Sequence, residues 1–312
     1  MYLGLDIGGT NIKTGVLNTS GELIFRDKTK TKASDGVDSV INLIESIIRQ
    51  TLDKYPNIET IGIGVPGVVD YSGLVKIAPN LPGWENIALK ERLANSFGKP
   101  LAIDNDANAA AVAELKLGAG VLHEHFLFIT LGTGVGGTII YNGKIFGGAN
   151  GNAGEVGHTI IDYKAPAPEG KPGFRAGVLE EFIGRTQIIQ MAKGIIKNYP
   201  DSLLHEYEEK LDVVDISNAV DKEDRAAIKC FEETANYLGT GLATILNILD
   251  LNTIIIGGGI SRSNKLLFEK TEEVLKNRAL PSITEKIQIK IAKFNNEAGI
   301  IGAALIGREF GR

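Results

Sequence analysis

The segment LGLDIGGTNIKTGVL, residues 3–17, has the pattern of a buried strand, a glycine-rich turn and a second strand. Residues 126–146, FLFITLGTGVGGTIIYNGKIF, repeat this layout with almost no residue identity. Their Asn142-Gly143 pair is typical of a two-residue hairpin turn. Two copies of one strand–turn–strand unit predict two related α/β halves around a cleft.

The apolar periodicity elsewhere predicts alternating strands and helices. An apolar stripe at helical spacing over residues 37–52 predicts a helix. Further strands are predicted in 23–30, 60–67, 100–104, 251–260 and 287–294, and helices in 105–117, 176–195, 203–250 and 297–307. The Pro- and Gly-rich segment 162–177 is either a domain linker or an ordered loop beside a site.

Composition narrows the class of protein. A chain of 312 residues is long enough for two domains. Its 33 basic and 38 acidic residues give a net charge of −5 with no basic block, which argues against nucleic acid as the main partner. The N-terminus lacks the pattern of a signal peptide, and no apolar run is long enough for a membrane span. Cys230 is the only cysteine and lies in a helical apolar pattern, so we interpret it as a buried small side chain rather than a catalytic thiol. These features favour a cytoplasmic protein.

The second glycine turn contains the spacing GxGxxG at Gly132, Gly134 and Gly137. A dinucleotide-binding fingerprint requires a helix after the glycines, whereas a β-pattern follows here, so we reject that interpretation. Backbone amides in such turns can bind phosphate oxygens. Two ordinary hairpins are the alternative, but Asp6 at the first turn and a third glycine group at 257–259 favour a nucleotide site.

The segment IDNDANAAAVAE, residues 103–114, places Asp104, Asn105, Asp106 and Asn108 beside small apolar residues. Polar groups in such a place must pair or do chemistry. One interpretation is a helix cap made by Asp104 or Asn105, and another is a carboxylate that takes part in chemistry; both can hold. Glu155 and His158, three residues apart, face the same way if the segment starts a helical turn, and both can hydrogen-bond hydroxyl groups, although an isolated His is more often structural.

These segments, together with IGVPGVVD (63–70), NLPGW (80–84), LGTGVGGTIIYNGKIFGGANGNAGEVGH (131–158) and GGGI (257–260), resemble the ROK family of bacterial sugar kinases and repressors. The resemblance implies the two-domain actin-like ATPase (ribonuclease H-like) α/β fold with an interdomain cleft. The expected small domain comprises 1–107 plus 297–312, and the large domain comprises 108–296. The implied reaction is ATP-dependent phosphorylation of a hexose, with glucose favoured. Kinases for N-acetylmannosamine, fructose or another sugar are the alternative, and a homodimer is expected.

The resemblance also implies roles for individual residues. Asp106 is the expected catalytic base, preferred over Asp104, and it also contacts the sugar. Asp6 is the expected Mg²⁺-side carboxylate, acting through water. The further sugar contacts implied are Asn80, Asn105, Glu155, His158, Glu180 (with Glu181 the near alternative) and Gly67. The ATP-binding residues implied are Asp6, Gly8, Gly9, Thr10, Asn11, Lys13, Gly132, Thr133, Gly134, Gly257, Gly258 and Gly259; Lys13 could equally be a solvated strand lysine.

One segment departs from the family pattern. Many members follow the GH pair with CxCGxxGCxE, which with the His binds a structural zinc, but residues 159–182 contain no cysteine. We therefore expect no structural zinc. A repressor of the same family carries an N-terminal helix-turn-helix, for which no room is expected because the first strand begins at Tyr2. A chaperone-type or cytoskeletal ATPase of the same fold is a further alternative, but such a protein has no need for the segment EVGH at residues 155–158.

Overall fold

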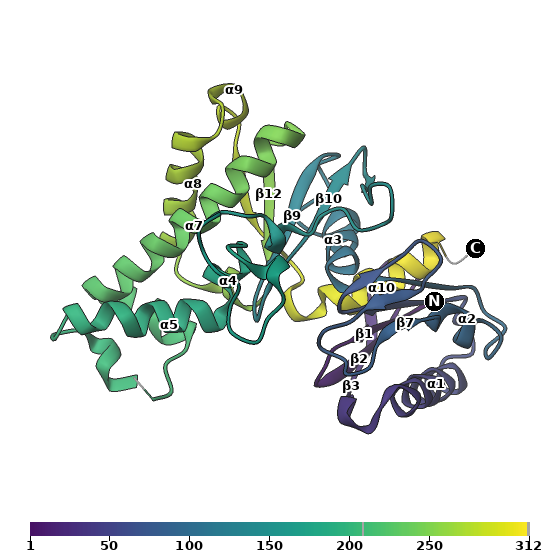
Figure 1. The fold of residues 1–312 in the computed structure, drawn as a ribbon. Helices are drawn as coiled ribbons and strands as arrows, with labels where there is room; N and C mark the ends of the chain where they lie inside the picture. Colours follow the sequence, from purple (N-terminus) through teal and green to yellow (C-terminus); the bar gives the residue numbers. More distant parts are fainter. Residues whose placement is uncertain (208, 311–312) are drawn as a thin grey trace. The chain divides into compact units, whose positions relative to one another are not determined.

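The computed structural model describes residues 1–207 and 209–310, and the chain divides into two compact units. The first unit comprises Met1–Glu124, Thr138–Gly154 and Lys293–Arg312, and the second comprises His125–Gly137 and Glu155–Ala292. Figure 1 shows the elements of each unit. The domain boundary expected after residue 107 stays a prediction. In the first unit, helix α3 (Asp106–Leu117) packs on α10 (Ala298–Phe310).

Two five-stranded sheets have matching strand orders, β3-β2-β1-β4-β8 and β11-β10-β9-β12-β13. The first is built from β1 (Tyr2–Ile7), β2 (Asn11–Leu17), β3 (Leu23–Lys30), β4 (Thr60–Val65) and β8 (Leu101–Asn105). The second is built from β9 (Phe126–Leu131), β10 (Val135–Tyr141), β11 (Lys144–Ile145), β12 (Thr253–Gly257) and β13 (Gln288–Ile291). In each sheet, three strands that follow one another along the chain lie side by side, and two further strands extend the sheet parallel to the first of them. The repeated layout predicted from the sequence is confirmed.

A small third sheet was not predicted. It contains β5 (Val68–Val69), β6 (Val75–Ile77) and β7 (Glu85–Ile87), all antiparallel. Its strands have two or three residues, which is too short for a recognisable alternation. The sheet gives a fixed course to the chain between β4 and the short helix α2 (Leu89–Ala94).

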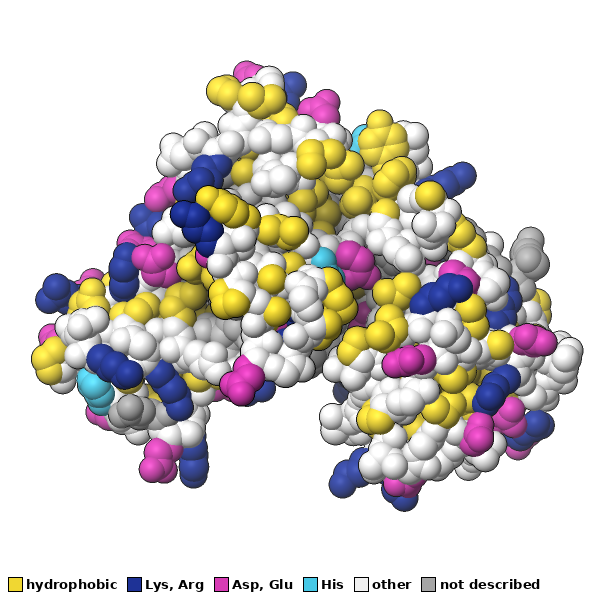
Figure 2. Space-filling view, viewed as in Figure 1, with side chains coloured by type: hydrophobic (Ala, Val, Ile, Leu, Met, Phe, Trp, Pro, Cys, Tyr) yellow, Lys and Arg dark blue, Asp and Glu magenta, His cyan; other side chains and the backbone are white. Residues whose placement is uncertain are grey.

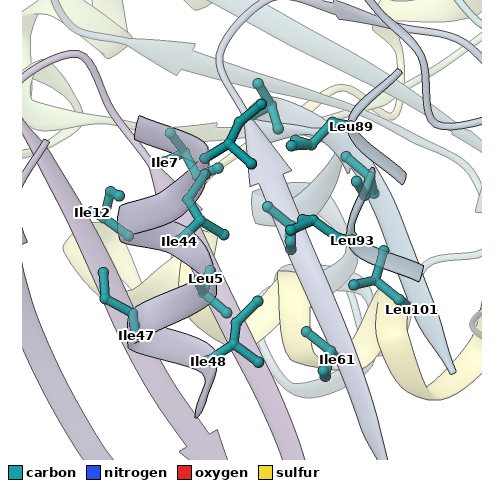
Figure 3. Packing of buried hydrophobic residues seen from close by; sticks show 14 of the residues in the cluster. Leu5, Ile7, Ile12, Ile44, Ile47, Ile48, Ile61, Leu89, Leu93 and Leu101 are labelled. Atoms are coloured by element: carbon teal, nitrogen blue, oxygen red, sulfur yellow. The ribbon is translucent and has the colours of Figure 1, made fainter. Parts of the chain in front are cut away.

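One face of the first sheet packs against α1 (Val37–Lys54), whose apolar stripe is the one seen in the sequence. Leu5, Ile7 and Ile12 from the sheet lie opposite Ile44 and Ile48 from the helix (Figure 3). These side chains are at most 1% exposed. Burial of each stabilises the unit by about 1.5–3 kcal/mol, so the helix depends on this contact more than on its own propensity.

The other face of the same sheet packs against α10, which lies on the opposite side from α1 (Figure 1). Gly4 and Gly62 allow this approach, because a methyl group at either position would overlap backbone atoms of α10. Gly302 does the same from the helix side, where a methyl group would overlap the carbonyl oxygen of Ala109 in α3. Glycines therefore let three backbones come close together.

The second unit contains β9, β12 and β13 and is otherwise mostly helical. Its helices are α4 (Glu180–Ile183), α5 (Arg185–Ile195), α6 (Val213–Val220), α7 (Arg225–Leu249), α8 (Leu266–Arg278) and α9 (Pro281–Thr284). The long helix α7 packs along α8 and also contacts α5, as Figure 1 shows. Cys230 in α7 is fully buried, as predicted, and burial raises the pKa of its thiol to about 12.

Acidic and basic side chains are interspersed on the face shown in Figure 2, without a large block of Lys and Arg. Among the described residues, no helix combines the length and the apolar character needed to cross a membrane.

Candidate functional site

The first glycine turn joins β1 to β2 and is held from both sides. The Gly8 amide donates to the Asn11 carbonyl at 2.9 Å, and the Thr31 hydroxyl donates to the Gly8 carbonyl at 2.6 Å. Gly9 lies against the Asn80 carbonyl oxygen, which would be 2.5 Å from an added Cβ atom. The turn and Asn80, predicted separately from the sequence, are thus adjacent.

Lys13 is not merely a solvated strand lysine. Its ammonium group lies 3.2 Å from Asp6 Oδ2 and donates to the Asn296 carbonyl, also at 3.2 Å. Asp6 itself lies against Gly299 in the first turn of α10, where a Cβ atom would be 2.6 Å from the carboxyl carbon. The Asp6 carboxylate is thus held between Lys13 of β2 and the first turn of α10.

Asp6 shares one edge of the first sheet with the predicted base segment. The parallel register aligns Asp6 of β1 with Gly64 of β4, and Gly64 with Asp104 of β8. The carboxyl ends of parallel strands meet at the same sheet edge, which is where α/β proteins bind ligands. Asp6, Gly67 and Asp106 therefore all belong to this edge of the first unit.

Asn105 ends β8 and caps α3. Its Oδ1 accepts from the amides of Ala107 at 2.8 Å and Asn108 at 3.2 Å, while its Nδ2 donates to the Gly67 carbonyl at 2.6 Å. The cap interpretation is confirmed for Asn105. It also places Asp106 as the first residue of α3, half-buried, where its Oδ1 accepts from the Ala107 amide at 2.8 Å.

Asp104 has a different environment from Asp106. Its Oδ1 accepts from the Asn105 amide and from Asn108 Nδ2, both at 2.7 Å. Asn108 Oδ1 in turn accepts from the Thr138 hydroxyl at 2.9 Å, and both of these residues are buried. Burial raises the pKa of Asp104 above its ordinary value, against the smaller opposing effect of its hydrogen bonds. Asp104 is thus committed to a structural network.

In the second unit, two glycine groups lie together. Gly258 has a φ of 85°, and a methyl group there would overlap the Leu131 backbone just before the second glycine turn. Within that turn the Gly132 amide donates to the Gly134 carbonyl at 3.0 Å. The Arg185 amide, at the start of α5, donates to the Gly132 carbonyl at 2.9 Å. The segments 132–134 and 257–259 are thus neighbours, as a shared nucleotide site requires.

Glu180 joins this turn to the Pro-rich loop. Its Oε2 accepts from the Val135 amide at 2.7 Å, and a Cβ atom at Gly134 would occupy the place of that oxygen. Its Oε1 accepts from Arg175 Nη2. Glu181 accepts from the same guanidinium, at 2.5 Å from Nε, and from Lys171 at 2.7 and 2.8 Å. Burial alone would raise the pKa of Glu181, but these cations outweigh it and lower that pKa.

Glu155 and His158 lie at either end of a single 3-10 turn. Burial of its carboxyl group raises the pKa of Glu155, although the residue as a whole is exposed; His158 opposes this effect and Glu180 adds to it. The His158 ring packs against Phe174, with centroids 5.8 Å apart. The three predicted sugar contacts of the second unit are therefore electrostatically coupled.

The segment after His158 lacks the cysteines of the family's zinc motif. Residues 159–182 contain no cysteine or second histidine, and the described residues hold no cluster of three or more His, Cys, Asp or Glu with metal-binding geometry. The loop is instead closed by backbone hydrogen bonds: Ile161 and Asp162 amides donate to Gly177, and the Leu179 amide donates to Thr159. Residues 162–177 lie wholly within the second unit, so the segment is not a linker between the units; that it borders a functional site stays a prediction.

The sequence did not predict the contacts of Arg175 and Lys171 with the Glu180-Glu181 pair. It also did not predict the hydrogen bond between Asn108 and Thr138 or the buried hydrogen bonds of Glu114. Arg175 and Lys171 stand in a loop without periodicity, and only the adjacent Glu180-Glu181 pair signals that cations are needed nearby. Glu114 is fully buried in α3, where its carboxylate accepts from the Ala119 and Phe294 amides.

Two repeated sheets with glycine turns after their first strands define the class: an α/β protein of the actin-like ATPase fold. The chain belongs to the ROK family, which it matches over residues 2–309. It is 34% identical to a glucokinase of Halalkalibacterium halodurans, over 99% of this chain and 95% of that protein. It is 30% identical to a xylose repressor of Caldicellulosiruptor bescii, over 96% of this chain and 76% of the repressor.

A solved structure supports the same fold. The ROK family glucokinase of Streptomyces griseus, in complex with glucose and AMPPNP, superposes with a TM-score of 0.81 at 30% identity, covering 99% of each chain.

Proposed function

We propose that this chain transfers the γ-phosphoryl group of ATP to a hexose hydroxyl, with glucose the first substrate to test. The observation that carries the proposal is the near full-length match to glucokinases, one of which was solved with glucose and an ATP analogue. N-acetylmannosamine, fructose or another sugar is the alternative within the same reaction.

Asp106 is the proposed base. The Asn105 cap fixes the first turn of α3, so the Asp106 side chain starts from a rigid point at the sheet edge that also carries Asp6. An ionised carboxylate there accepts the proton of the attacking hydroxyl as the phosphoryl group is transferred. Asp104 is less suited to this role, because its Oδ1 accepts two internal hydrogen bonds and is committed to the network with Asn108.

The proposed sugar contacts are the residues that the family resemblance implies. Asn80, Gly67 and Asn105 are supplied by the first unit, and Glu155, His158 and Glu180 by the second. Glu180 is preferred to Glu181, since the Glu181 side chain is 7% exposed and holds two cations, whereas Glu180 is 24% exposed.

The proposed nucleotide contacts are the backbone amides of the two glycine turns, with 257–259 against the adenosine. They comprise Gly8, Gly9, Thr10, Asn11 and Lys13 in the first unit and Gly132, Thr133, Gly134, Gly257, Gly258 and Gly259 in the second. Asp6 offers a hard oxygen ligand at the strand end, so it fits Mg²⁺ bound through water; the ion supplies charge neutralisation at the phosphates.

The test is a coupled ADP-release assay across glucose, mannose, fructose, N-acetylglucosamine and N-acetylmannosamine. Asp106→Asn is expected to lower kcat by about 10²–10⁴-fold while the sugar KM changes little. Glu91→Gln, an exposed change in the same unit, is the control. If the protein phosphorylates none of these sugars, the proposed function is contradicted. If D106N keeps full activity, the proposed base is contradicted. Size-exclusion with light scattering tests the expected homodimer.

The similarity to a xylose repressor supports one alternative, a sugar-responsive DNA-binding protein. That function requires a basic surface, and the net charge of −5 disfavours it. A salt-dependent gel shift with operator DNA, together with the absence of ADP release, would favour the repressor.

A further inference from the structure

The Pro-rich loop ends in a short 3-10 turn, Gly173–Arg175, that contacts two of the proposed sugar ligands. Phe174 packs against the ring of His158, and Arg175 donates to Glu180. Adjacent residues of one turn therefore contact His158 and Glu180, which belong to the separate segments 156–158 and 180–183.

Arg175 is placed as a bridge between two neighbouring carboxylates. Its Nη2 lies against both Glu180 Oε1 and Glu181 Oε1, and its Nε donates to Glu181 at 2.5 Å. The side chain is 18% exposed, so the ion pairs are largely shielded from solvent. A planar guanidinium with fixed donors holds two carboxylates in one geometry, which an ammonium group cannot do.

Glu180 is held from its other side as well. Its second oxygen accepts from the Val135 amide at 2.7 Å, so the carboxylate is fixed between the glycine turn and the loop. With both oxygens engaged, the orientation of its remaining lone pairs is set before any ligand arrives.

We propose that Arg175 is the positioning residue of the sugar subsite: it fixes the Glu180 carboxylate in the orientation that receives the sugar hydroxyl. This inference rests on the proposed function and names the part of the chain that controls sugar affinity. Lys171 supports the turn only through Glu181, 2.7 Å away, and in the described part of the chain it makes no hydrogen bond or ion pair with Glu180.

The experiment compares Arg175→Met with Lys171→Met as the matched control, on the sugar that the wild type phosphorylates best. R175M is expected to raise the sugar KM at least tenfold with kcat and the ATP KM within about twofold, because Glu180 binds ground and transition states alike. K171M is expected to keep both KM values within twofold. R175K keeps a cation without the planar fork, so its sugar KM is expected between the two.

A sugar KM for R175M equal to that of K171M overturns the inference, as does an equal rise in the ATP KM, which indicates general disruption. If R175M does not fold, R175K carries the test: its sugar KM must rise at least threefold, and a wild-type value refutes the role. Failure of the proposed function gives a different result, because the wild type would then release no ADP with any of the sugars tested.

Discussion

Glu114 tests whether a buried carboxylate holds the end of α3 to the segment just before α10. It is a fully buried carboxylate in α3, and its two oxygens accept from two different segments. Oε2 accepts from the Ala119 amide at 2.7 Å, just beyond the helix end, and Oε1 accepts from the Phe294 amide at 2.8 Å, just before α10. Replacement by Gln keeps the shape of the side chain and removes one acceptor.

The magnitude follows from the hydrogen bonds. A bond to a charged group contributes about 1.5–3 kcal/mol, and a buried donor left without an acceptor costs about 1–3 kcal/mol. In Glu114→Gln one amide keeps a neutral acceptor while the other faces an NH₂ group. We expect the free energy of unfolding of this unit to fall by about 2–4 kcal/mol, a large part of the roughly 5–15 kcal/mol typical of a native protein.

The assay is urea unfolding followed by the fluorescence of Trp84. It is the only tryptophan, it is 2% exposed, and it belongs to the core of the first unit, so it reports that unit's unfolding. The midpoint should fall by about 1 M or more with an unchanged m value. Glu91→Gln, exposed in α2, should stay within about 0.5 kcal/mol of the wild type. A midpoint for E114Q equal to that of E91Q would refute the assigned junction.

Three further outcomes follow from particular contacts. Gly302→Ala should destabilise the protein by about 1–3 kcal/mol or more, because the methyl group meets the Ala109 carbonyl, whereas Gly194→Ala in α5, which has open space, should stabilise it by about 0.5–1 kcal/mol; thermal unfolding of both variants checks the contrast. Cys230, buried with a pKa of about 12, should resist a disulfide reagent at pH 8 until the protein is unfolded in urea, and rapid labelling of the native protein would contradict its burial. Glu181 has a lowered pKa, so its ionised form stabilises the folded state above its ordinary pKa, and this stability is lost as pH falls through the folded-state value; Glu181→Gln should lower Tm by more at pH 7 than at pH 3, and a pH-independent difference would contradict the ion pairs.

The strands of the two large sheets and the long helices were predictable because their signals are local. The stripe of α1, the positive φ values of Asn142 and Gly143, and the Asn105 cap each depend on residues within a few positions of one another. Such patterns survive folding when tertiary contacts agree with them, as they do in this chain.

The missing parts depend on partners far apart in the chain. Glu114 and Phe294 are 180 positions apart, and no periodicity links them. Glu180 and Val135 are 45 positions apart, in segments whose meeting depends on the whole second unit. The charge cluster of the loop depends on Lys171 and Arg175, which a sequence pattern cannot distinguish from solvated cations.

The role of each glycine also depends on residues far away in the chain. Their abundance favoured close approach to a ligand, yet Gly4 and Gly62 face α10, so those glycines serve helix packing. Gly134 lies in the predicted phosphate turn, but the space beside it is filled by the Glu180 carboxylate that bonds to Val135. Any side chain at Gly134 would displace Glu180, so this one position constrains the proposed nucleotide turn and the proposed sugar contact together. A Gly134→Ala variant with normal KM values for both substrates would show that the two are independent.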